Sequence, residues 1–293
     1  MKRSHSALSM IAATVGLCIV SAAAGAQELI DCPSAMPSGG PQATASYQMY
    51  NDVCFLDRFP PSGLPILLFD DFSWRSFLAL AWPAKDGQRG APDTGLTLGS
   101  AANHPSVFET FKSEWEVFQK DGRDPIGWNE YGGQLPCDVP SLAPGDIVLA
   151  ASSKLDNIVQ SGGSGPLIAQ NRTFVRYTTG FNETLFRKIV DGGLFRRANL
   201  GNFAPLPSGT IRIKSSWIDM QGIERPERFH TRDAWLLDPA TNQCQKKTVG
   251  LVGLHIVTKT PTHPQEIWST FEHVDNVPGP NASAPFTFNN GDG

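Results

Sequence analysis

The segment Val249–Pro278 constrains the fold of this chain more than any other stretch. Its first half, VGLVGLHIVTKT, places apolar side chains on both faces of one strand, a pattern typical of a central strand covered on both sides. Pro261 and Pro264 cannot donate to a sheet ladder, so they place a turn between roughly Thr260 and Gln265. The sequence therefore predicts an antiparallel hairpin whose first strand lies inside the molecule.

Four polar side chains stand out on this hairpin: His255, Glu272, His273 and Asp275. Opposed residues of an antiparallel pair have a constant sum of positions, so the register decides which of the four meet. A sum of 526 or 528 brings His255, His273 and Asp275 to one face, a ligand set suited to Zn, Fe or Cu. A sum of 527 sends His273 to the other face and opposes His255 to Glu272, a pair suited to acid–base catalysis.

A third interpretation of the same residues is structural. His255 then forms a hydrogen bond inside the core, and Asp275 caps the turn that follows the hairpin. The residue pattern leaves the metal, catalytic and structural interpretations open.

The rest of the chain predicts short elements. Glycine and proline together account for 51 of 293 residues (28 and 23), which indicates many turns. Three helices are expected: residues 72–82, apolar nearly all round and therefore deeply buried; residues 107–118, behind a capping box at 106 and 109; and Glu183–Asp191, which follows Asn182 and ends at Gly192.

The expected strands set the fold class. Thr210–Trp217 alternates apolar and polar residues, so one of its faces is wet and carries Arg212, Lys214 and Ser216. The helices do not alternate with strands as a parallel α/β sheet requires. We therefore predict an α+β fold with an antiparallel, β-sandwich-like sheet and with helices mainly from the N-terminal half.

The N-terminus has the pattern of a secretory signal peptide. Lys2 and Arg3 precede an apolar stretch, and small residues up to Ala26 provide a cleavage site. We expect residues 1–26 to be this signal peptide, 27–46 an extended arm, 47–277 a single globular domain and 278–293 a flexible tail. The predicted location is periplasmic or secreted, with no membrane span, because no later segment approaches the ~20 apolar residues that a membrane helix needs.

Charge and cysteine content restrict the partners. Removing residues 1–26 takes away two basic side chains and leaves 22 basic against 28 acidic ones, a net charge of −6 with no basic stripe. Nucleic acid is therefore not an expected partner. The four remaining cysteines allow three pairings; we favour Cys32–Cys54 and Cys137–Cys244. No C-x-x-C-H occurs, so the chain carries no site for covalent haem.

Several blocks of the sequence resemble a known group. WRSFLALAWP, IKSSW, GLHIVTKTP and IWSTFEHVDNVP are similar to segments of exported, uncharacterised bacterial proteins that are often labelled as cytochrome c family members. Many of those proteins carry a C-x-x-C-H segment after the hairpin block, which this chain lacks. The resemblance implies a bacterial periplasmic setting and an association with periplasmic redox proteins.

Three functions follow as hypotheses. The first is a redox-associated exported protein with a transition metal bound by His255, His273 and Asp275. The second is an exported hydrolase that acts on a small-molecule substrate through His255 and Glu272. The third is a non-catalytic carbohydrate- or protein-binding module, which requires exposed aromatic side chains on one face. Trp74, Trp115 and Trp217 lie on apolar faces and are expected in the core.

Overall fold

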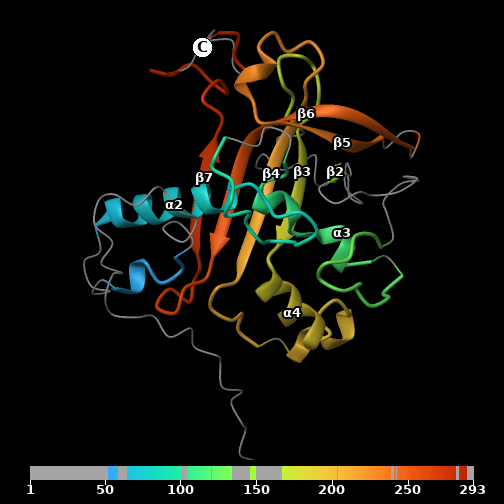
Figure 1. Cartoon of the computed structure of the whole chain (residues 1–293). Coiled ribbons are helices and arrows are strands. Elements are labelled where there is room, and N and C mark those ends of the chain that lie inside the picture. The colour runs from blue at the N-terminus through green and yellow to red at the C-terminus, as the bar shows by residue number, and fades with distance from the viewer. Residues whose placement is uncertain are drawn as a thin grey trace, which may run out of the picture.

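A computed structural model shows one strongly curled sheet of seven strands, with helices packed against it (Figure 1). It describes residues 52–58, 65–99, 104–119, 121–133, 146–149, 167–202, 204–238, 241, 243–281 and 284–288. The predicted signal peptide and N-terminal arm lie outside these residues. So do Cys32 and Cys137, and the two predicted disulfides stay a prediction.

The longest elements are α2 and β6, with 15 and 16 residues. The helical elements are η1 (Leu56–Arg58), α2 (Ile66–Leu80), η2 (Val107–Thr110), α3 (Glu114–Val117), α4 (Glu183–Asp191), η4 (Arg197–Asn202) and η5 (Pro226–Arg228). The strands are β1 (Lys112–Ser113), β2 (Ile147–Leu149), β3 (Arg176–Phe181), β4 (Ile211–Asp219), β5 (Thr231–Asp238), β6 (Gln243–Thr258) and β7 (Ile267–Glu272).

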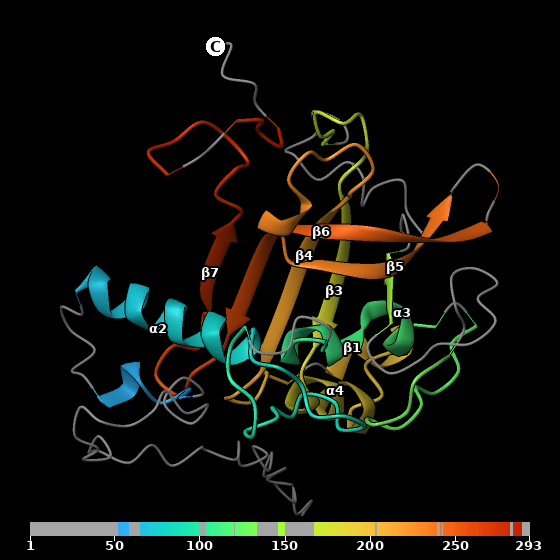
Figure 2. The same cartoon turned by 45° about the horizontal axis from the view of Figure 1, so that its top comes forward.

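Strand β6 organises the sheet because it is 16 residues long and pairs with three neighbours. Val249 and Gly250 pair with β4 on one edge and with β5 on the other, whereas residues 253–258 pair with β4 and β7. β5 and β7 therefore occupy the same edge of β6, one beside each half of the strand. Figure 2 shows β5 and the first half of β6 crossing the ends of β3 and β4.

This arrangement corrects the predicted sheet. The fold is α+β, as predicted, but the sheet curls into a half-barrel and is not a sandwich. It is also mixed, because β2 pairs in parallel with β5. The physical reason is the length of β6: one strand belongs to both halves of the sheet, so the sheet bends on itself, and the helices cover the enclosed core.

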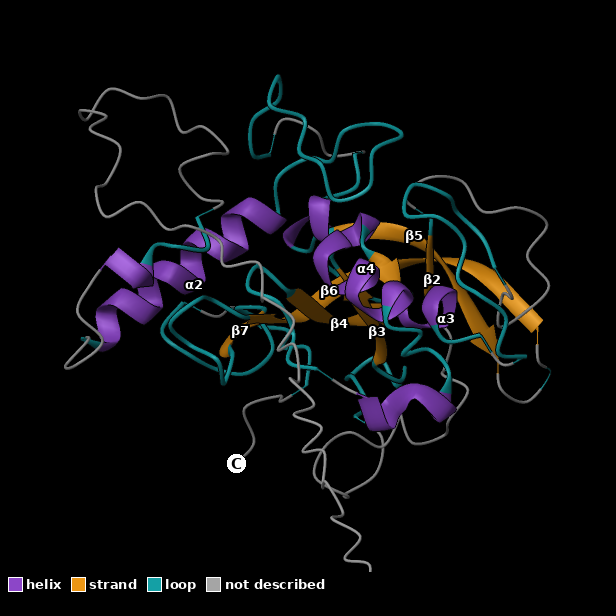
Figure 3. Ribbon diagram, turned by 90° about the horizontal axis from the view of Figure 1, so that it is seen from below, coloured by secondary structure: helices purple, strands orange, loops and turns teal. Residues whose placement is uncertain are grey.

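The main core lies between the sheet and the helical elements. Trp217, Leu254 and Ile256 of the sheet meet Leu80 of α2 and Val117 of α3 there. α2 packs against β7, which it crosses in Figure 1 and next to which it lies in Figure 3. Ser73 Oγ lies 2.7 Å from Ser269 Oγ, and Phe77 contacts Phe271. In the described part of the chain, none of the helices combines the length and the hydropathy that crossing a membrane requires.

The first predicted helix differs from the observed one. α2 begins at Ile66, directly after Pro65, and not at residue 72. Proline is well tolerated where a helix starts, so the earlier start is physically reasonable. The helix is also less buried than predicted: it lies at the edge of the sheet, and Trp74 is 56% exposed.

The second predicted helix is broken into three elements. The capping box of Ser106 and Glu109 is present, but only the 3-10 turn η2 follows it. Phe111 then adopts an extended conformation, and Lys112 and Ser113 pair with Phe181 and Gly180 of β3. A second capping box, formed by Ser113 and Glu116, starts α3.

Two other predicted elements, α4 and β4, are confirmed, and their sequence signals are local. α4 spans Glu183–Asp191 as predicted, and the Asn182 side chain accepts a hydrogen bond from the backbone N–H of Leu185. β4 contains most of the predicted strand. Part of the predicted tail, residues 284–288, packs back on the domain: the backbone N–H of Thr287 donates to the carbonyl of Asp275 over 2.7 Å.

Candidate functional site

The register of the β6–β7 hairpin determines which of its polar side chains share a face. His255 pairs with Thr270 and Thr258 with Ile267, a constant sum of 525. The sum is odd, and it differs from the values 526, 527 and 528 that we considered. The turn that sets it is held from outside the hairpin, because Asp57 accepts a hydrogen bond from the backbone N–H of Thr262 over 3.1 Å.

His255 and Glu272 lie on the same face, but the residue opposite His255 is Thr270. The His255 Nδ1 atom is 2.9 Å from Thr270 Oγ1, and the imidazole is half-buried. The Glu272 carboxylate is opposite Gly253 and accepts a hydrogen bond from Asn276 Nδ2 over 2.8 Å. The two predicted catalytic residues are thus neighbours on one surface, each held by a different partner.

His273 and Asp275 lie beyond the end of β7, in an arrangement of their own. The His273 ring stacks on Phe229 with centroids 4.0 Å apart. Its Nε2 donates to the carbonyl of Arg228 over 3.0 Å, and its Nδ1 accepts from the backbone N–H of Asp275. Both carboxylate oxygens of Asp275 accept from the Arg228 guanidinium.

These contacts do not bring together the predicted metal ligands His255, His273 and Asp275. Both nitrogens of His273 and both carboxylate oxygens of Asp275 already have partners, and His255 pairs with Thr270. Across the described residues, no group of three or more His, Cys, Asp or Glu side chains is placed to hold a metal ion. The arrangement of His273 and Asp275 is instead one that fixes the chain after β7.

The pairings of β3 with β4, β4 with β6 and β6 with β7 create a polar surface across four strands, which we call the open face. Alternation places every second residue of each strand on this side, opposite the side that α2 covers. The pairings align these residues in three rows: Phe181, Arg212, Val257 and Trp268; Thr179, Lys214, His255 and Thr270; and Tyr177, Ser216, Gly253 and Glu272.

Charged groups on the open face are paired with neighbours. The Lys214 Nζ lies 4.7 Å from the centre of the Tyr177 ring. Partial burial lowers the pKa of Lys214, and the negative charge of Glu114 opposes this shift. Partial burial, and secondly the negative charge of Glu272, raise the pKa of Tyr177. Gly253 leaves room beside these groups, since a Cβ there would lie 3.4 Å from Glu272 Oε2 and 3.5 Å from Ser216 Oγ.

Trp268 is the exposed aromatic side chain of the open face, at 63% exposure, whereas Tyr177 is half-buried. The Arg212 guanidinium lies 5.8 Å from its ring centre and also contacts Glu266, with Nη2 3.4 Å from Oε2. A cation beside the ring limits the orientations that the indole can adopt. Trp268 is therefore presented to solvent as a supported, planar surface.

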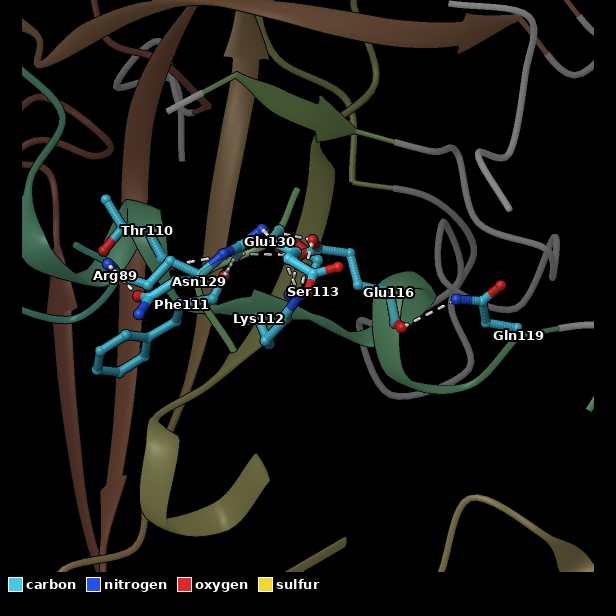
Figure 4. A network of polar contacts seen from close by, with 9 residues as sticks. All are labelled: Arg89, Thr110, Phe111, Lys112, Ser113, Glu116, Gln119, Asn129 and Glu130. Atoms are coloured by element: carbon cyan, nitrogen blue, oxygen red, sulfur yellow. Dashed lines mark hydrogen bonds and ion pairs between the residues drawn. The ribbon is translucent and has the colours of Figure 1, made fainter. Parts of the chain in front are cut away.

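Sequence reasoning missed a second polar cluster, which lies inside the domain (Figure 4). Arg89 and Glu116 form two hydrogen bonds, with Nη2–Oε1 2.5 Å and Nη1–Oε2 3.2 Å apart. Lys112 Nζ is 3.6 Å from Glu116 Oε1 and donates to the carbonyl of Glu130 over 2.7 Å. The side chains of Arg89, Glu116 and Lys112 are 2%, 3% and 0% exposed.

This buried cluster contains two cations and one anion. Burial, and secondarily the nearby charge of Arg89, lower the pKa of Lys112 to about 8, although Glu116 acts in the opposite direction. A strongly shifted pKa can indicate a catalytic residue, but a catalytic residue must be accessible to a substrate. These three side chains are closed off from solvent, so we interpret the cluster as structural. The capping-box pattern Ser113-x-x-Glu116 was the signal available in the sequence.

No protein-family model matches this chain, and neither a curated protein nor a solved structure shows a significant match.

Proposed function

We propose that the protein is an exported, non-catalytic binding module that holds a saccharide on its open face. The observation that carries this proposal is the exposed, supported ring of Trp268 beside rows of hydrogen-bonding side chains. Aromatic rings offer a flat apolar surface to the C–H groups of a sugar, and the surrounding polar groups can bond its hydroxyls. The export part of the proposal is supported by the N-terminal sequence pattern.

The spacing along β7 fits an extended ligand. Trp268, Thr270 and Glu272 all face the same side. Successive residues on one face of a strand are about 7 Å apart, so the three side chains span about 14 Å. His255, next to Thr270, adds a half-exposed imidazole whose Nε2 has no hydrogen-bond partner among the described residues. A short oligosaccharide lying along β7 could stack on the indole and bond to the two rows beyond it.

The open face is less suitable for a protein partner. A stable protein–protein interface buries about 800 Å² on each side, around an apolar centre. Trp268 is the one large apolar side chain that is exposed in the three rows, since Phe181 and Val257 are buried. Several polar groups have neighbouring partners already: Arg212 contacts Glu266, and Glu272 accepts from Asn276.

The geometry also favours binding over hydrolysis. Acid–base catalysis by the predicted pair needs contact between the His255 imidazole and the Glu272 carboxylate, or with a common substrate atom. Thr270 and Asn276 are the respective partners of the two groups. The hydrolase and the metal-bearing redox protein stay as hypotheses from the sequence.

Two tryptophan variants test the proposal. Binding of gluco-, xylo- and N-acetylglucosamine oligosaccharides is measured by calorimetry for the wild type, Trp268→Ala and Trp74→Ala. Trp74 is the matched control, because it is 56% exposed but lies on α2, away from the open face. We expect Trp268→Ala to weaken binding at least about tenfold and Trp74→Ala to leave it unchanged. Absence of binding by the wild type, or equal affinities of the wild type and Trp268→Ala, would contradict the proposal.

A further inference from the structure

A charged groove away from the open face is lined by residues of β3, β4, β5 and β6. Figure 2 shows that β5 and the first half of β6 cross the ends of β3 and β4. The volume of the groove is about 250 Å³. Arg172 and Arg176 line it together with Asp219, Asp238, Gln245 and Lys247. Because Arg176 and Tyr177 are successive residues of β3, their side chains point to opposite faces of the sheet. The groove is therefore distinct from the proposed saccharide surface.

Arg176 is a partly buried cation with most of its donors unused. Its Nη1 donates to the carbonyl of Leu237 over 2.9 Å, and within the described part of the chain the guanidinium has no other hydrogen-bond or ion-pair partner. A guanidinium carries five N–H donors. Burial lowers the pKa of Arg176, although Asp238 and Asp219 act in the opposite direction. A half-buried guanidinium with free donors beside a cavity is suited to an anionic ligand.

Arg172 reaches the groove from a turn that is held in an unusual conformation. Its φ is +63°, in the left-handed region that glycine or asparagine usually occupies. Asn171 anchors the turn to the end of β4, because its side-chain amide donates to the carbonyls of Asp219 and Gln221 over 2.7 and 3.1 Å. Among the described residues, the Arg172 guanidinium has no ion-pair partner. The turn thus directs a free cation to the groove at a conformational cost.

The charges of the groove favour a monoanion. Arg172, Arg176 and Lys247 contribute three positive charges, and Asp219 and Asp238 contribute two negative ones, which gives a net charge of +1. Lys247 Nζ donates to Asp219 Oδ2 over 2.6 Å, so these two charges neutralise each other. A phosphate dianion carries more negative charge than the net charge of +1 can balance, and the carboxylates of the groove would repel it. A ligand with a single carboxylate would balance the net charge of +1.

The remaining lining residues of the groove indicate which other groups the ligand carries besides its carboxylate. The amide of Gln245 has no partner among the described residues and can bond a hydroxyl group. Leu236, Leu237 and Phe174 supply apolar surface. Small-molecule pockets are generally about 300 Å³ or larger, so this groove fits a compact ligand.

We propose that this groove binds a small hydroxy-carboxylic acid, such as a sugar acid, whose carboxylate is held by the guanidinium groups of Arg172 and Arg176. This inference is independent of the saccharide proposal, since it concerns a different face and a different ligand class.

Calorimetry with D-glucuronate tests the proposal on the full-length mature protein at constant ionic strength, with D-glucose, phosphate and sulfate as comparison ligands. We expect saturable binding of glucuronate and much weaker binding of the other three. Arg176→Gln should lower the affinity for glucuronate at least about tenfold, and Arg172→Gln about three- to tenfold. The matched control is Lys246→Gln, which removes one positive charge at an exposed position outside the groove and should leave the affinity unchanged.

Several results would overturn the proposal. These are failure of glucuronate to bind, equal binding of glucose, and tighter binding of phosphate. An equal loss of affinity in Lys246→Gln would show that binding depends on net charge and not on the groove. If Arg176→Gln does not fold, Arg172→Gln decides the question, because Arg172 is exposed on a turn and its substitution leaves the core intact.

Discussion

The buried cluster of Arg89, Lys112 and Glu116 makes a prediction with a defined sign and magnitude. The pKa of Lys112 is lowered from 10.5 to about 8 in the folded protein. The unfolded chain therefore binds more protons than the folded chain between these values, and the stability contributed by this residue rises as the pH increases from 8 to 10.5. A difference of 10.5 − 8 = 2.5 pKa units corresponds to about 3 kcal/mol.

Replacing Lys112 with methionine should remove this dependence. Methionine is also unbranched and fills a similar volume without a charge. The neighbouring polar groups keep partners, because Arg89 still bonds to Glu116 and to the carbonyl of Glu130. At pH 7 the variant should avoid the cost of about 3 kcal/mol and lose a hydrogen bond worth about 1 kcal/mol. We therefore expect it to be about 2 kcal/mol more stable than the wild type at pH 7 and slightly less stable above pH 10.

Urea unfolding followed by tryptophan fluorescence at pH 7, 8, 9 and 10 measures this difference. Lys246→Met is the control for loss of one positive charge at an exposed site, and it should change the stability by less than about 0.5 kcal/mol. An equal stability difference between Lys112→Met and the wild type at pH 7 and pH 10 would refute the lowered pKa of Lys112.

Three further predictions concern stability and metal content. Glu116→Gln leaves two buried cations without their anion, so it should cost about 3–5 kcal/mol in the same urea assay; a loss below 1 kcal/mol would contradict the importance of the ion pair. Arg172→Gly removes the strain of a non-glycine residue in the left-handed conformation, which is about 1–2 kcal/mol, and adds a backbone entropy cost of about 0.5–1 kcal/mol. Its melting temperature should stay equal or rise slightly while glucuronate binding weakens, and a clear fall in melting temperature would disagree with the turn geometry. His255→Ala should leave the metal content of the purified protein unchanged, because His255 does not meet His273 and Asp275; loss of a stoichiometric metal, measured by mass spectrometry, would restore the metal hypothesis.

The elements that sequence reasoning predicted correctly are those whose determinants are local. α4 follows the capping residue Asn182 and is followed by Gly192, and both signals lie directly beside the helix. The region 107–118 has helical spacing of its aromatic residues as well, yet Lys112 and Ser113 pair with β3, about 70 residues away. That pairing outweighs the local preference and divides the segment, and no pattern inside the segment reveals it.

In the candidate site too, some features are determined by neighbouring residues and others by residues far away in the sequence. The alternation of apolar and polar residues in β4 correctly predicted a polar face that carries Arg212, Lys214 and Ser216. His255 joins that face through the pairing of β4 with β6. Which residues of β7 join it depended on the register of β6 with β7, which a contact from Asp57 to the turn helps to set. Asp57 lies about 200 residues before that turn, so the hairpin sequence alone could not provide the answer.

The parity of that register separates the four polar residues that the hairpin sequence presents together. An odd sum places His255 and Glu272 on the open face with Trp268. His273 and Asp275 then follow the strand end, where Phe229 and Arg228 hold them. One group is thus available to a ligand and the other closes the fold. Had the sum been even, Glu272 would have turned toward α2 and His273 toward solvent, and the open face would have lost the acceptor at the end of its third row.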